Sequence, residues 1–121
     1  MEHALKVAAH FEYGTDEHTI ALLHDVIEDG ATTESTLRAT YPARIVDTVV
    51  ELTRVYEETY AEYIERLVSD EAIAVKIADV EENLARSSKY HSLHKRYQRA
   101  LMALLVKRQI ADRLERTHVR F

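Results

Sequence analysis

The sequence predicts a single all-α domain, and three observations carry that prediction. The chain has 121 residues, 46% of them hydrophobic, which is enough for one domain with a buried core. Only two glycines and one proline occur, and this scarcity argues against a sheet with many turns. Apolar residues recur at helical spacing, so we expect one bundle of about six helices over residues 1–121.

Four of these helices are expected in the first half of the chain. The first covers 3–13. The second begins with Asp16 as its cap and ends at Gly30. A short third helix follows a cap at Thr33, and Pro42 suits the first turn of the fourth.

The second half is expected to hold the central and terminal helices. Thr59, followed three residues later by Glu62, has the spacing of a capping box. Asp70 is the expected cap of the next helix, in which 72–80 is apolar almost all round, as in a helix at the centre of a domain. The β-branched residues there would also permit a strand, but no partner strand is evident. A last helix is expected from 92 to 114, with this apolar stripe: Tyr97, Leu101, Leu104, Leu105 and Ile110.

Charge and composition exclude several classes of protein. The net charge is −5 with the histidines neutral, and the sequence shows no basic face of the kind that binds nucleic acid. Cysteine is absent, so histidine and the carboxylates are the available metal ligands. Neither a signal peptide nor an apolar run of membrane-spanning length is found, so we expect a cytoplasmic protein without a membrane partner. A homo-oligomer is left open.

Ionisable residues gather where the expected second helix ends. His24 and Asp25 follow an apolar run, and Glu28 and Asp29 come after two intervening residues. Carboxylates near the C-terminal end of a helix are disfavoured by the helix dipole, by roughly 0.3–1 kcal/mol each. A divalent metal ion would supply the missing positive charge, and an imidazole beside a carboxylate suits Mn, Fe, Co or Zn.

Asp79 is the second unusual residue, because it lies within the apolar run at 72–80. A buried, unpaired carboxylate would be destabilising by several kcal/mol, so a cation is expected beside it. Lys76, three residues earlier on the same helical face, is one candidate. A metal ion shared with His24 and Asp25 is the other, and both remain open at this point.

The order of these residues resembles a known ligand pattern. His3, the His24 and Asp25 doublet, and the distant Asp79 are arranged as in the HD-domain phosphohydrolases, where such residues hold a divalent ion inside a helical bundle. The resemblance narrows to the RelA/SpoT-type alarmone hydrolases. Residues 24–29 match their HDxxED segment, and 75–83 is similar to their KLADxxxN segment.

Two shorter segments extend the resemblance over roughly residues 3–90. The start, 3–8, is similar to the HPxxVA helix of that family, with Ala4 in place of proline. Residues 52–54 occupy the place of a Val-Thr-Lys or Leu-Thr-Arg element. In that family, basic residues before the first metal histidine contact the guanine base, and because only two residues precede His3 here, the resemblance carries no expectation of guanine recognition.

The resemblance implies a role for each of these residues. The implied metal ligands are His3, His24, Asp25 and Asp79, with Mn²⁺ first among the candidate cofactors. Glu28 and Asp29 would orient or deprotonate the attacking water, and Asn83 would contact the sugar or phosphate of the substrate. Lys76 and Arg54 are further candidates for contact with the substrate. The alternatives are an ion pair with Asp79 for Lys76, a surface salt bridge for Arg54, and a merely polar position for Asn83.

Two functions follow as expectations. The first is a metal-dependent phosphohydrolase acting on a small phosphorylated metabolite, a nucleotide foremost, with (p)ppGpp-like molecules among the options. The second is a non-catalytic helical module that binds a metal ion or a nucleotide without turnover. The acids at 28 and 29 favour the hydrolase, because a purely structural metal site does not need two further carboxylates beside its ligands.

Overall fold

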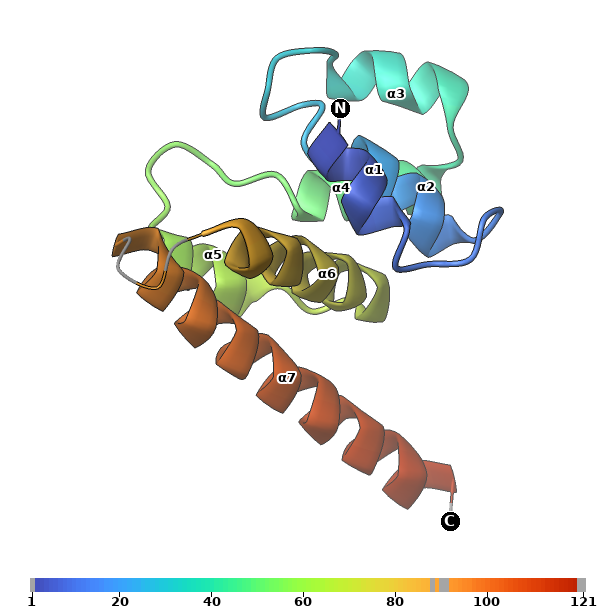
Figure 1. The fold of residues 1–121 in the computed structure, drawn as a ribbon. Coiled ribbons are helices and arrows are strands. Elements are labelled where there is room, and N and C mark those ends of the chain that lie inside the picture. The colour runs from blue at the N-terminus through green and yellow to red at the C-terminus, as the bar shows by residue number, and fades with distance from the viewer. Residues whose placement is uncertain (1, 88, 90–91, 120–121) are drawn as a thin grey trace.

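A computed structural model gives the fold, and it describes residues 2–87, 89 and 92–119, with side chains up to residue 116. Every element in this part of the chain is a helix, and the all-α prediction is confirmed (Figure 1). The seven helices described there are α1 (Glu2–Ala8), α2 (Asp16–Leu23), α3 (Glu34–Thr40), α4 (Ala43–Glu51), α5 (Tyr60–Arg66), α6 (Asp70–Arg86) and α7 (Ser92–Val119).

Helix α6 is the centre of the bundle. It packs against α1, α2, α4 and α7, while α1 pairs with α2 and α5 with α7. Figure 1 shows α1 to α4 gathered on one side of α6, and α7 crossing its other side before it extends away towards the C-terminus. Helices from the start of the chain (α1 and α2), from its middle (α4) and from its end (α7) therefore meet along α6.

The buried character of α6 follows from its sequence. Val75 and Val80 are fully buried, and most residues between them are buried too. Because the whole segment lies within the helix Asp70–Arg86, the strand alternative is wrong. The helix begins one residue earlier than expected, because the Ser69 side chain, and not Asp70, is its N-cap and accepts a hydrogen bond from Ala72 N at 3.1 Å.

The first two helices begin or end differently from the sequence prediction. Helix α1 ends at Ala8, before the expected end at residue 13. The N-cap of α2 is Thr15, whose side chain accepts a hydrogen bond from His18 N at 3.2 Å. Asp16 is instead the first helical residue, and its carboxylate pairs with Arg44 at 2.7 Å.

The end of α2 differs most from the prediction. The helix ends at Leu23, and the chain from 24 to 30 forms a series of turns instead of a continued helix. The reason lies in the backbone hydrogen bonds: Val26 N bonds to Leu23 O, three residues back, and Ala31 N bonds to Val26 O, five residues back. Gly30, with φ +74°, then redirects the chain.

The remaining caps agree more closely with the sequence. Thr33 caps α3 as expected. Pro42 precedes α4 as its N-cap residue, one position before the expected first turn. Thr59 and Glu62 form the complete capping box of α5, with both reciprocal hydrogen bonds.

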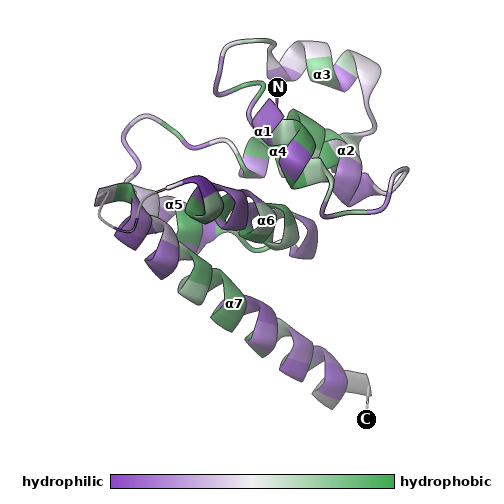
Figure 2. Cartoon of the chain, in the orientation of Figure 1, coloured by the Kyte–Doolittle hydropathy of each residue, from purple (hydrophilic) through white to green (hydrophobic). Residues whose placement is uncertain are grey.

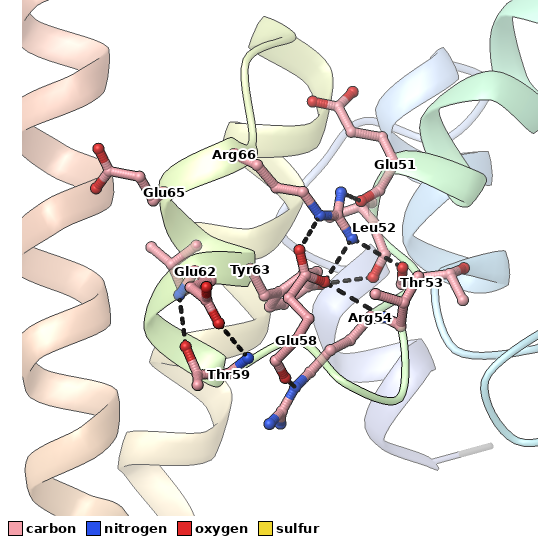
Figure 3. A network of polar contacts seen from close by, with 12 residues as sticks. Glu51, Leu52, Thr53, Arg54, Glu58, Thr59, Glu62, Tyr63, Glu65 and Arg66 are labelled. Carbon is pink, nitrogen blue, oxygen red and sulfur yellow. Dashed lines mark hydrogen bonds and ion pairs between the residues drawn. The ribbon is translucent and has the colours of Figure 1, made fainter.

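Helix α5 is tied to the loop before it by Arg66 (Figure 3). The Arg66 guanidinium donates to Glu51 O at 2.6 Å, to Thr53 O at 2.9 Å and to the Glu58 carboxylate at 2.5 Å. The Tyr63 hydroxyl adds a 2.5 Å bond to Leu52 O. These contacts satisfy the last carbonyls of α4 and fix the loop at 52–59 against the bundle.

Helix α7 is buried only in its first half. Leu104 is fully buried, whereas Leu105 and Ile110 are 37% and 54% exposed, so the expected apolar stripe is wrong for these two residues. Figure 2 shows the change, with green in the middle of α7 and mostly purple towards its C-terminal end. Among the described residues, no helix combines the length and apolarity needed to cross a membrane.

Candidate metal centre

Three side chains from distant helices converge beside α6. His3 comes from α1, His24 from the end of α2 and Asp79 from α6, and one ligand atom of each lies within 4.8 Å of the other two. His3 Nε2 is 2.5 Å from Asp79 Oδ1, and His24 Nε2 is 3.5 Å from the same oxygen. His24 and Asp79 are buried, while His3 is partly exposed. We call these residues the three-residue group.

The orientation of His24 leaves one ring nitrogen available. Nδ1 donates to Ala21 O at 2.6 Å, because a carbonyl can only accept. Nε2 is buried and has no hydrogen-bond partner among the described residues, although it lies 3.1 Å from Asp25 Oδ2. Nδ1 is thus held by a carbonyl, while Nε2 faces the Asp25 and Asp79 carboxylates. Once Nε2 has lost its proton, this arrangement is typical of a metal-ligating histidine.

The spacing of the ligand atoms suits a divalent ion. Adjacent ligands of a six-coordinate ion with bonds of about 2.1 Å lie about 3 Å apart. The separations at His24 Nε2, 3.1 Å to Asp25 and 3.5 Å to Asp79, are close to that value. His3 Nε2 and Asp79 Oδ1 are hydrogen-bonded at 2.5 Å, so these two atoms would have to move apart to hold an ion between them. Two imidazoles and a carboxylate form a mixed nitrogen and oxygen set that fits Mn, Fe, Co or Zn.

The electrostatics of the site favour a positive charge. Burial lowers the pKa of His24, but the carboxylates of Asp25 and Asp79 that face Nε2 outweigh burial and raise the pKa to about 10. Burial raises the pKa of Asp79, but His24, His3 and Lys76 together hold it well below its usual range. A metal ion bound by the histidine nitrogens would therefore lie beside the ionised carboxylate of Asp79.

Asp25 lies beside the three-residue group and not within it. Its carboxylate oxygens do not lie within 4.8 Å of all three ligand atoms of the group. Its side chain is 38% exposed. Burial raises the pKa of Asp25, but the neighbouring His24, together with Lys76, brings it below its usual value. Asp25 is therefore placed at the open side of the group, with Oδ2 close to His24.

Lys76 forms the ion pair that the sequence left open as an alternative. Its Nζ donates to Asp79 Oδ2 at 2.7 Å and lies 4.9 Å from the centre of the Tyr63 ring. Asp79 Oδ1 faces the two histidines, so the carboxylate divides its oxygens between the lysine and the histidines. The ion pair and a metal site are therefore compatible.

Asn83 supports Asp79 from one turn further along α6. Its Nδ2 donates to Asp79 Oδ1 at 3.4 Å, and its Oδ1 accepts from Arg86 Nη2 at 2.7 Å. Asn83 is buried, and both ends of its amide contact protein groups. In this arrangement it orients a candidate ligand, and contact with a substrate would require it to give up one of these bonds.

Glu28 and Asp29 lie in the turns that follow His24, and both are exposed. Because α2 ends at Leu23, neither acid lies in the last turn of a helix, and the prediction that both do is wrong. Glu28 Oε1 accepts a hydrogen bond from the backbone nitrogen of Arg54 at 2.9 Å. Neither acid belongs to the three-residue group.

Arg54 belongs to the loop between α4 and α5. It is half-buried, and its Nε donates to Glu58 O at 3.1 Å. Its guanidinium carbon lies 5.6 Å from the centre of the Tyr60 ring. The contacts described for its side chain are thus with α5 and its preceding loop. Its backbone nitrogen bonds to Glu28, which lies outside the three-residue group.

Glu82 and His10 were not singled out by the sequence argument as site residues. Glu82 lies three residues after Asp79 on α6, and its Oε1 is 2.8 Å from His10 Nε2. Glu82 also lines a cavity of about 260 Å³ together with His3, Lys6 and Arg86. The spacing of three from Asp79, which places both acids on one helical face, was the available signal.

The chain was also compared with known proteins. No protein-family model matches the chain, and no curated protein matches it significantly. The relation to the HD-domain hydrolases therefore rests on the motif resemblance and stays a prediction.

Proposed function

We propose that the protein is a metal-dependent phosphohydrolase that acts on a small phosphorylated metabolite, a nucleotide foremost. The observation that carries the proposal is the convergence of His3, His24 and Asp79 on one point, with the bare Nε2 of His24 directed at it. These residues are separated by up to 76 positions in the sequence. A buried cluster of this composition is a recognised setting for a catalytic metal ion.

The residues divide into holding and positioning roles. His3, His24 and Asp79 would hold the ion, with Asp25 as the fourth ligand at the open side. A bound divalent ion would lower the pKa of a water molecule and polarise a phosphoryl oxygen. Asn83 would keep Asp79 in place, and Mn²⁺ is the first candidate for the metal.

The hydrolysis has a simple balance of bonds and protons. A bond forms between the water oxygen and phosphorus as the bond from phosphorus to the leaving oxygen breaks. One proton leaves the water for a carboxylate, for which Glu28 and Asp29 are the candidates, and the same carboxylate, or solvent water, returns a proton to the leaving oxygen. Lys6 and Arg86, which line the cavity beside His3, would attract the phosphate.

A non-catalytic module that binds a metal ion or nucleotide is the second candidate. Its support is that several implied catalytic and substrate groups already have protein partners. Glu28 accepts from Arg54 N, and both ends of the Asn83 amide are engaged. Binding without turnover would need none of these groups to be released.

The two candidates differ in a turnover assay. Phosphate release from a panel of phosphorylated nucleotides would be measured with Mn²⁺ and with a chelator as the control. The hydrolase proposal predicts metal-dependent release that is lost in Glu28→Gln/Asp29→Asn while Mn²⁺ binding is kept. Asp47→Asn, an exposed acid outside the site, is the matched control and should behave as the wild type. Metal binding without release from any nucleotide would favour the non-catalytic module.

A further inference from the structure

A second cavity lies between α5 and α7 and shares no lining residue with the three-residue group. Its volume is about 480 Å³, within the range of pockets that hold small organic ligands. Tyr60 is part of its lining. Its apolar lining comes from Ala61, Ile64, Ala100 and Ala103.

Positive charge lines the same cavity. Arg96 and Arg99, one turn apart on α7, are both exposed, and neither forms an ion pair with a residue that the structure describes. Glu65 is the acidic residue of the lining, so two arginines face one carboxylate. The cavity therefore combines an apolar surface with a surplus of positive charge.

The cations around Tyr60 add to this surplus. Three of them surround its ring, with Arg96 Cζ at 5.0 Å, Arg54 Cζ at 5.6 Å and Lys76 Nζ at 5.7 Å from the centroid. Asp79 balances the charge of Lys76, whereas within the described chain neither arginine has a carboxylate at ion-pair distance. An aromatic face attracts cations but does not neutralise them, so an anion would be favoured here.

We propose that the cavity between α5 and α7 binds an organic anion. An apolar body would pack against the alanine and isoleucine side chains, and a phosphate, sulfonate or carboxylate group would contact Arg96 and Arg99. Guanidinium groups bind such oxyanions through charge-assisted, often bidentate hydrogen bonds. The site stands apart from the proposed hydrolase activity, because none of its lining residues is a candidate metal ligand.

Two matched fluorescent probes test this site on the full chain. One is 8-anilinonaphthalene-1-sulfonate, and the other is N-phenyl-1-naphthylamine, which has the same aromatic body without the sulfonate. The sulfonate should bind more tightly than the neutral probe. The double variant Arg96→Gln/Arg99→Gln should weaken binding of the sulfonate probe by about tenfold. The affinity for the neutral probe should change by no more than about twofold. Arg108→Gln, an exposed arginine further along α7, is the matched control and should change neither.

A third variant tests the cavity itself. Ala103→Trp places a large side chain at an exposed position in the cavity lining. It should weaken binding of both probes by about tenfold or more. Thermal unfolding by circular dichroism would establish that each variant is folded. Sulfonate binding that is unchanged in Arg96→Gln/Arg99→Gln, or probe binding that is unchanged in Ala103→Trp, would overturn the proposal.

Discussion

Replacing Asp79 by asparagine tests how the buried charges at the centre of α6 depend on one another. The substitution keeps the shape of the side chain but removes the negative charge that pairs with Lys76 at 2.7 Å and His3 at 2.5 Å. Lys76 is only 8% exposed, so its ammonium group would remain buried with tyrosine faces as its main neighbours. Breaking a buried pair in this way destabilises a protein by about 3–5 kcal/mol.

The expected shift in melting temperature follows from the size of the chain. For a domain of 121 residues, a change of 1 kcal/mol shifts Tm by about 4 °C, so Asp79→Asn should lower Tm of the metal-free protein by about 12–20 °C. Differential scanning calorimetry in the presence of a chelator measures this shift. Asp47→Asn, which removes an exposed acid paired with Arg38, should lower Tm by about 4 °C or less.

A double variant separates lost charge from lost packing. Lys76→Met in the Asp79→Asn background removes the unpaired ammonium group and should recover part of the lost stability. A Tm of Asp79→Asn within about 4 °C of the wild type would show that the buried charge of Lys76 does not depend on Asp79. A double variant that is less stable than Asp79→Asn would show the same.

Three further predictions concern stability. Because the folded-state pKa of His24 is raised from 6.5 to about 10, its stabilising contribution is fully present below pH 6.5. In urea unfolding of the metal-free protein, the free energy of unfolding should therefore fall as the pH rises from 6.5 to about 10. His24→Gln should show a smaller decline over the same pH range. Thr59→Ala removes a capping-box hydroxyl and should lower the free energy of unfolding by about 1 kcal/mol, with Tm unchanged as the opposing result. Gly30→Ala places a Cβ at φ +74° without a nearby clash and should destabilise by about 1–2 kcal/mol in urea unfolding, whereas no change would contradict the strain argument.

Much of the fold could be predicted from local rules in the sequence. Hydrophobic periodicity identified the helices, and the capping box at Thr59 and Glu62 marked the start of α5 correctly. Caps at Thr15 and Ser69 were misassigned by one residue, because an acidic residue follows each hydroxyl and either type can cap a helix. The end of α2 depends on turn hydrogen bonds after Leu23, which apolar spacing alone does not reveal.

The candidate site was predictable in part for a different reason. His24 and Asp79 stood out because ionisable residues occur in apolar segments, and the structure brings both together with His3. The divided use of the Asp79 oxygens could not be predicted, since it depends on how α1 and α2 pack on α6. The pairing of Glu82 with His10 likewise joins α6 to the loop after α1.

Titration of the metal-free protein with Mn²⁺ by isothermal calorimetry measures whether the three-residue group binds one divalent ion, as we claim. The wild type should bind one ion per chain, and Arg108→Gln should match it. His24→Gln should lose that binding, because the bare Nε2 is the best-oriented ligand of the group. Absence of binding in the wild type, or equal binding in His24→Gln, would contradict the claim.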